Sequence, residues 1–114
     1  TNKGYFFGIY NSKLGYYSNA WKSANTTLSS GIWYHTAITI DSSGNYIMYL
    51  NGVSDGSGAS NLPVTGEDTF KIGAYGLNGG LGRFNGLIDD IRVYNRVLSA
   101  EEIQRLYDLG NLKP

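Results

Sequence analysis

Short runs of alternating apolar and polar residues recur along this chain, separated by segments rich in Gly, Asn, Asp and Ser. Side chains along a β-strand point alternately to the two faces of a sheet, so this period of two predicts strands. In the first run, for example, Phe6 and Tyr10 share one face while Phe7 and Ile9 share the other. Six runs fit the pattern: residues 3–10, 14–21, 32–41, 46–53, 69–75 and 84–95.

The segments between the runs carry turn signals. Asn11-Ser12-Lys13 is short and polar enough to join the first two runs as a hairpin. Residues 41–45 and the pair Asn51-Gly52 predict two further turns, because Asn and Gly tolerate positive φ angles. Residues 22–31 and 54–61 are polar or rich in Gly and Ser, and we expect surface loops there.

A short helix is predicted at the C-terminal end. Ser99 followed by Glu102 forms the capping-box pattern of a helix start. A glycine at position 110 is suited to stop the helix. Three apolar residues would form one stripe that covers an edge or end of the strands: Ile103, Leu106 and Tyr107.

Composition supports one all-β domain over residues 1–114. Glycine is abundant, with sixteen residues, and most of them lie between the apolar runs, where turns are expected; the ten tyrosines suit half-buried strands. Nine basic and nine acidic residues cancel without clustering, so a nucleic-acid binder is not expected. No apolar run approaches the ~20 residues of a membrane-spanning helix, which argues against membrane insertion. The absence of cysteine excludes disulfides and thiolate metal sites.

Three segments resemble a known family in the order in which they occur. Residues 33–41, led by Trp33, are similar to the tryptophan-led strand of the laminin G-like and concanavalin A-like lectin-glucanase jelly rolls. Residues 49–52 are similar to the turn that ends the next strand, and residues 84–107 to the closing strand and its helix. The resemblance covers the C-terminal two-thirds of the chain. It implies an antiparallel β-sandwich with one short C-terminal helix, in a secreted or cell-surface protein.

The resemblance also implies that some strands are missing at the N-terminal end. Domains of this family usually begin with further strands, and nothing before Lys3 supplies them. We therefore expect residues 1–114 to be a single but partial domain. An upstream segment, a neighbouring domain or another chain would then complete the sandwich.

Catalysis is not expected. His35 is the single histidine and falls within a predicted strand, where a packed imidazole is commoner than a catalytic one. Adjacent strand residues point to opposite faces, so Asp89 and Asp90 cannot flank one glycosidic bond as acid and base. Glu101 and Glu102 fall in the first helical turn, where they have a capping role.

Two readings remain open for the aspartates. Alternation places Asp89 with Leu87 and Ile91, so Asp89 is expected to be buried and to accept loop amides, while Asp90 pairs with Arg92 or Arg96. The second reading is a calcium site, because relatives often bind that ion through carboxylate and carbonyl oxygens. Its candidate ligands are Asp89 and Asp55.

Sugar recognition is the favoured function, since aromatic rings can stack on the apolar face of a pyranose. Tyr17 and Trp21 share a strand face beside a polar loop. Tyr75 leads into a loop with four glycines that holds Asn78 and Arg83; the alternative there is a tight bend between sheets. The sequence thus predicts a non-catalytic module that binds carbohydrate or glycoprotein. The alternatives are that the tyrosines only fill the sheets, and that the module makes protein contacts through its sheet edges.

Overall fold

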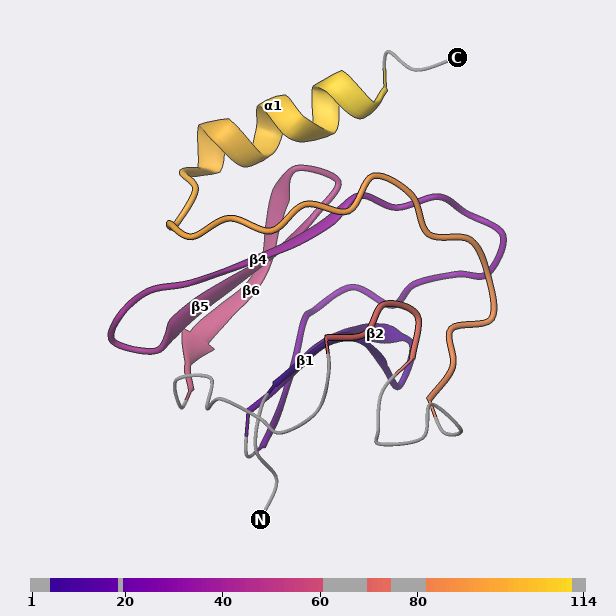
Figure 1. Ribbon diagram of the computed structural model, residues 1–114, viewed down its shortest axis with the longest axis horizontal. Helices are drawn as coiled ribbons and strands as arrows, with labels where there is room; N and C mark the ends of the chain where they lie inside the picture. The colour runs from indigo at the N-terminus through magenta and orange to yellow at the C-terminus, as the bar shows by residue number, and fades with distance from the viewer. Residues whose placement is uncertain (1–4, 19, 61–69, 75–81, 112–114) are drawn as a thin grey trace.

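The computed structural model describes residues 5–18, 20–60, 70–74 and 82–111. These residues form two three-stranded antiparallel sheets and one helix (Figure 1). The first sheet contains β1 (Phe6–Tyr10), β2 (Lys13–Tyr17) and β3 (Trp21–Ser23), in that order. The second contains β4 (Thr36–Ile40), β5 (Asn45–Leu50) and β6 (Val53–Ala59), and helix α1 spans Ala100–Gly110.

The second sheet is the middle layer, because both of its faces are covered. Successive residues of β5 point to opposite faces. Tyr46 and Met48 pack against the first sheet, whereas Tyr49 packs against Leu98 and Ile103 at the start of α1. The prediction of an antiparallel β-sandwich with one C-terminal helix is therefore confirmed, and the helix covers the second sheet as a third layer (Figure 1).

The core between the two sheets is small and largely aromatic. Met48 and Tyr16 have no exposed surface, and Leu14 has 2%. Partly buried apolar residues from both sheets and from the loop after β3 surround the buried ones: Phe7, Leu28, Ile38, Ile40 and Leu50. Most of the burial that stabilises the sandwich thus comes from β2 and β5.

Two tight turns set the strand registers as the sequence predicted. Asn11 and Ser12 both have positive φ and connect β1 to β2. Asn51 and Gly52 do the same between β5 and β6, at φ values of 51° and 82°. Such left-handed pairs suit two-residue hairpins because their twist matches that of the strands.

A β-bulge in β6 joins the two sheets. Met48 pairs with Gly56 and Tyr49 with Ser54, so Asp55 is an extra residue with no partner in the ladder. Its carbonyl accepts a hydrogen bond from the Asn25 amide, at 2.8 Å. Its carboxylate accepts from the Thr26 amide, at 3.1 Å, and from the Thr26 hydroxyl, at 2.6 Å. The bulge therefore fixes the loop that leaves the first sheet.

Helix α1 begins at the predicted capping box. The Glu102 amide donates to the Ser99 hydroxyl, and the Ser99 amide donates to the Glu102 carboxylate. The same carboxylate accepts two hydrogen bonds from the guanidinium of Arg96. The helix ends at Gly110, where the sequence predicted its stop, and Asn111 caps it with right-handed backbone angles.

Five segments differ from the strand predictions of the sequence. Residues 84–95 and the described part of residues 69–75 are not strands, and Asp90 has φ of 56°, which interrupts an extended chain. Residues 21–23 and 53–59, within or beside predicted loops, are strands because they pair with β2 and β5. The strand expected at residues 32–41 starts only at Thr36.

In the part of the chain that the structure describes, no helix is long and apolar enough to cross a membrane.

His35 fixes the start of β4. Its amide donates to the Asn51 side-chain oxygen at 2.9 Å, and the Asn51 amide donates to its carbonyl at 2.7 Å. The imidazole lies 6.0 Å from the ring of Tyr107 on α1, and its buried Nδ1 has no hydrogen-bond partner among the described residues. Burial lowers the pKa of His35 below 6.5; Asp90 opposes this effect and Arg92 adds to it.

The lowered pKa of His35 predicts a loss of stability in mild acid. Below pH 6.5 the unfolded chain binds a proton that the folded chain resists, so the unfolding free energy falls as the pH is lowered from 7 toward 5. We expect His35→Phe, which keeps a ring against Tyr107, to flatten this slope. Urea denaturation at several pH values measures it. An equal slope in both proteins would contradict the assignment.

Glu102 predicts a second, more acidic transition. Hydrogen bonds from Arg96 and from the Ser99 amide lower its pKa from 4.5 to about 2. The stabilisation by the ionised carboxylate is therefore complete above pH 4.5 and is lost as the pH falls toward 2. Glu102→Gln should lose stability at pH 7 and respond less to acid between these values. Thermal unfolding of both proteins tests it, and parallel pH profiles would show that Glu102 is not involved.

Truncation of a core residue should be costly. Leu14→Ala removes a side chain that is 2% exposed between the sheets, and we expect a loss of about 2–5 kcal/mol in unfolding free energy. Val53→Ala is the matched control, because Val53 is 63% exposed and should change stability by about 0.5 kcal/mol or less. Urea denaturation measures both, and similar losses in the two variants would contradict the assigned core.

Candidate binding face

The face of the first sheet that points away from the second sheet is aromatic. Leu14 and Tyr16 point inward from β2, so Lys13, Gly15 and Tyr17 point outward. The strand registers bring residues of β1 and β3 to the same outer side. We call this surface the aromatic face; its residues are Phe6, Gly8, Tyr10, Lys13, Gly15, Tyr17, Trp21 and Ser23.

Trp21 is the centre of the aromatic face and contacts three other rings. Its indole stacks on Tyr10 with a centroid distance of 4.3 Å and an angle of 6° between the planes. Phe6 meets it edge-on at 5.6 Å, and Tyr17 lies at 5.3 Å with a tilt of 57°. Such contacts hold each ring in one orientation, so the four rings form a preorganised surface.

Two glycines allow the rings to lie close to the sheet. A Cβ atom at Gly15 would lie 3.0 Å from Cβ of Tyr10 and 3.1 Å from the Trp21 ring. At Gly8, a Cβ would collide with the ring of Phe6. The missing side chains in the middle of the sheet thus create the space in which the aromatic rings pack.

The chemistry of the aromatic face suits a ligand with an apolar side and a polar rim. The rings offer π surfaces, and the Tyr10 and Tyr17 hydroxyls can donate or accept hydrogen bonds. Lys13 pairs with Tyr10 in the strand register and contributes a cation, and none of the outward residues is acidic. A neutral or anionic ligand would therefore meet no electrostatic repulsion from the face itself.

The predicted site residues are only partly brought together. Tyr17 and Trp21 lie in contact, and Phe6 and Tyr10 join them, which the sequence prediction did not include. Arg83 is exposed, whereas Tyr75 and Asn78 lie outside the described residues. Alternation along β1 placed Phe6 and Tyr10 on a common face, and the glycines at positions 8 and 15 were the signal that could have extended the site.

The structure gives the two aspartates proposed for calcium different surroundings. Both carboxylate oxygens of Asp55 accept hydrogen bonds from Thr26. Asp89 is exposed rather than buried, which corrects the sequence prediction, and Arg92 pairs with Asp90 at 3.2 Å as expected. Among the described residues there is no group of three or more side chains that could hold a metal ion. Calcium binding stays a prediction.

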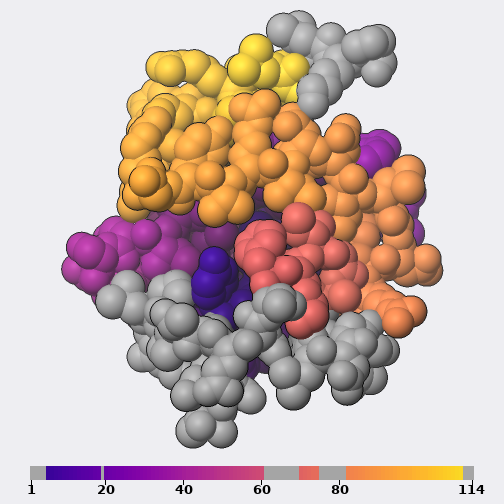
Figure 2. Space-filling model, in the orientation of Figure 1, coloured from indigo at the N-terminus to yellow at the C-terminus, as the bar shows by residue number. Residues whose placement is uncertain are grey.

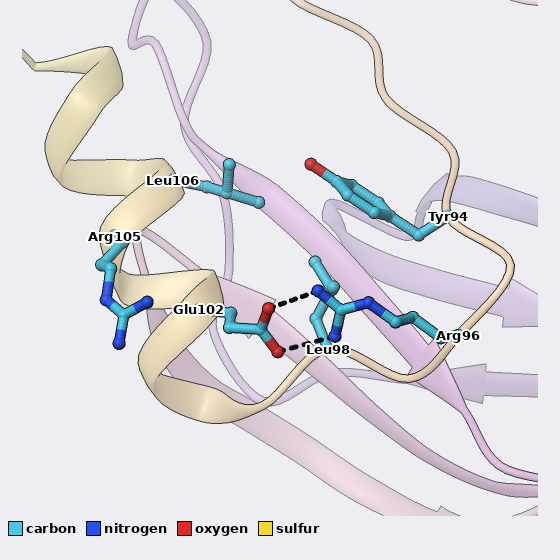
Figure 3. Close-up of a pocket in the computed structure, with 6 residues that line it drawn as sticks. All are labelled: Tyr94, Arg96, Leu98, Glu102, Arg105 and Leu106. Atoms are coloured by element: carbon cyan, nitrogen blue, oxygen red, sulfur yellow. Dashed lines mark hydrogen bonds and ion pairs between the residues drawn. The ribbon is translucent and has the colours of Figure 1, made fainter.

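A depression beside α1 is a second feature to consider as a site (Figure 3). Arg96 reaches across it to Glu102, so its two central charges already neutralise each other (Figure 3). Its volume is about 220 Å³, less than the ~300–1,000 Å³ of typical ligand pockets. We therefore assign this depression to the anchoring of the helix and regard the aromatic face as the candidate site.

Comparisons with known proteins agree with the fold. The crystal structure of an S-layer domain-containing protein from Clostridium thermocellum ATCC 27405 is similar, with a TM-score of 0.62 and 24% sequence identity. The similarity covers 90% of this chain and 60% of that one. A sequence model of the concanavalin A-like lectin/glucanases superfamily matches residues 1–104, so the match extends beyond the C-terminal two-thirds in which the resemblance was found. The chain belongs to the concanavalin A-like lectin/glucanases superfamily.

Proposed function

We propose that this chain is a non-catalytic module that binds glycans or mediates adhesion, in a secreted or cell-surface protein. The observation that carries the proposal is the aromatic face, where four rings lie in mutual contact around Trp21. The apolar C–H surface of a pyranose would stack on these rings, while its hydroxyl groups would reach Lys13 and the tyrosine hydroxyls at the rim.

The rigidity of the aromatic face favours binding over mere filling of the sheet. A ring that is held by its neighbours loses little conformational freedom when a ligand arrives, so less of the interaction energy is spent on ordering. Tyr10 is 38% exposed even though its ring is stacked on Trp21. The face therefore combines fixed geometry with accessible aromatic surface.

The family and the fold neighbour support the compartment. The family match is to a superfamily of lectins and glucanases. The neighbour is described as an S-layer domain-containing protein, which agrees with a role at the cell surface. The absence of an enzyme activity is part of the proposal: the His35 imidazole lies against the Tyr107 ring with its Nδ1 buried, and the Glu102 carboxylate accepts hydrogen bonds from Ser99 and Arg96.

A structural or assembly module remains the second candidate. Among the strands that the structure describes, the two outer ones of each sheet have one edge without a neighbour, and such edges can pair with another polypeptide. Ile9 on β1 and Val53 on β6 are exposed apolar residues on edge strands, which favours this reading. The first proposal implies that the partner is a carbohydrate or glycoprotein. The second implies that the partner is a neighbouring domain or another chain.

A glycan array followed by calorimetry with the best ligand tests the first proposal. We expect Trp21→Ala to weaken binding at least tenfold, which corresponds to about 1.4 kcal/mol, because it removes the ring that organises the other three. Trp33→Ala is the matched control: Trp33 is 64% exposed and lies on neither sheet, so its loss should leave the affinity unchanged.

The two variants also separate a loss of binding from a loss of fold. Far-UV circular dichroism and a thermal melt should show both variants folded, since the core between the sheets is untouched. Glycan binding that survives in Trp21→Ala but fails in Trp33→Ala would place the site elsewhere. The absence of any glycan ligand for the folded chain would favour the assembly role.

A further inference from the structure

Asn-Gly pairs are positions at which a polypeptide can modify itself. The backbone nitrogen of the second residue can attack the side-chain amide of the first, and glycine has no Cβ to hinder the approach. The sequence contains three such pairs, at residues 51–52, 78–79 and 85–86. The second pair lies outside the described residues, and the structure gives the other two opposite surroundings.

The pair Asn51-Gly52 is held in place by its contacts. Asn51 has φ of 51°, its side-chain oxygen accepts the His35 amide at 2.9 Å, and its own amide donates to the His35 carbonyl at 2.7 Å. Gly52 is buried, and a Cβ at this position would lie 3.0 Å from the Gln104 side chain of α1. An attack by the Gly52 nitrogen would therefore have to break the contact with His35 and open the turn.

The pair Asn85-Gly86 has no comparable restraint. It lies in the segment of residues 82–97, which runs along the surface of the molecule and is orange in Figure 2. Both residues are exposed, and neither makes a hydrogen bond within the described part of the chain. The Asn85 side chain can therefore rotate toward the Gly86 nitrogen, and solvent base can reach the Gly86 amide.

We propose that Asn85 is a site of spontaneous deamidation, at which the chain converts this asparagine to aspartate and isoaspartate. The Gly86 nitrogen attacks the side-chain carbonyl carbon of Asn85 and forms a five-membered succinimide ring. The bond from that carbon to the side-chain nitrogen breaks, and ammonia leaves with the proton that the Gly86 amide has lost. Water then opens the ring at either carbonyl, which gives the two products, so water is the only co-reactant.

Conversion would change the charge of the surrounding surface. Residues 70–74 and 84–97 contain three basic and two acidic side chains, which leaves one net positive charge: Lys71, Arg92 and Arg96 against Asp89 and Asp90. A carboxylate at position 85 would cancel that charge. Position 85 is exposed and belongs neither to the core between the sheets nor to the aromatic face, so the fold should survive conversion and the inference stands independently of the proposed glycan site.

Timed incubation in mildly alkaline buffer, followed by peptide mapping, measures conversion at Asn85 and Asn51 in the same protein. In the folded chain we expect Asn85 to convert at least about tenfold faster, which requires a barrier difference of about 1.4 kcal/mol. In denaturing urea the two rates should become similar, because the contacts that restrain Asn51 are lost. Isoelectric focusing should show a product more acidic than the starting chain, whose pI is about 6.5.

Two variants check the assignment. Asn85→Gln keeps a side-chain amide but would have to close a larger ring, so conversion at this position should be lost. Asn95→Gln is the matched control, because Asn95 is exposed on the same segment and is followed by Arg96; it should leave the rate at Asn85 unchanged. Equal rates at Asn85 and Asn51 in the folded chain would overturn the proposal. So would an Asn85 that converts in urea but stays intact in the folded chain.

Discussion

The structure depends on the burial of β5 from both sides. Met48 faces the first sheet and Tyr49 faces helix α1, so adjacent residues of one strand connect three layers. A strand covered on both faces must be apolar along most of its length, and residues 46–50 contain no charged or hydrogen-bonding side chain except two tyrosines. Both the aromatic face and the helix take their positions from this central strand.

Polar contacts then fix the elements that the core does not reach. Asp55 leaves the ladder at the bulge and holds the loop after β3, which sets how the first sheet lies on the second. Glu102 serves the helix start and Arg96 together, so the chain segment before α1 and the first helical turn are positioned as one unit. Each of these carboxylates binds two groups at once. In this way the loops are held in place although the core of the domain is small.

The sequence predicted features that depend on local interactions. The capping box at Ser99 and the Asn51-Gly52 turn were predicted correctly, because neighbouring residues determine them. Strand β6 was missed because its Gly- and Ser-rich residues are held by the backbone of β5 rather than by side-chain burial. Residues 84–95 show the converse: their apolar pattern is real, but no described strand pairs with them and Asp90 interrupts the extended chain.

The candidate site was predictable only in part for the same reason. Alternation put Tyr17 and Trp21 on one face of a single strand; the structure brings them to one face, but as paired residues of the separate strands β2 and β3. Their contacts with Phe6 and Tyr10 depend on the register between three strands, and the space for the rings depends on Gly8 and Gly15. Neither can be read from a single run of residues. The prediction that Asp89 is buried was wrong because it assumed a continuous strand through residue 90.

Asn51 shows how narrow the choice of residue can be at one position. Its backbone adopts a left-handed conformation at φ 51°, and its side chain accepts the amide of His35. Glycine would satisfy the first demand and forfeit the second, while glutamine would carry an acceptor but fit the backbone poorly. Only Asn or Asp meets both requirements. Substitutions during evolution should therefore be much rarer at position 51 than at the neighbouring surface positions.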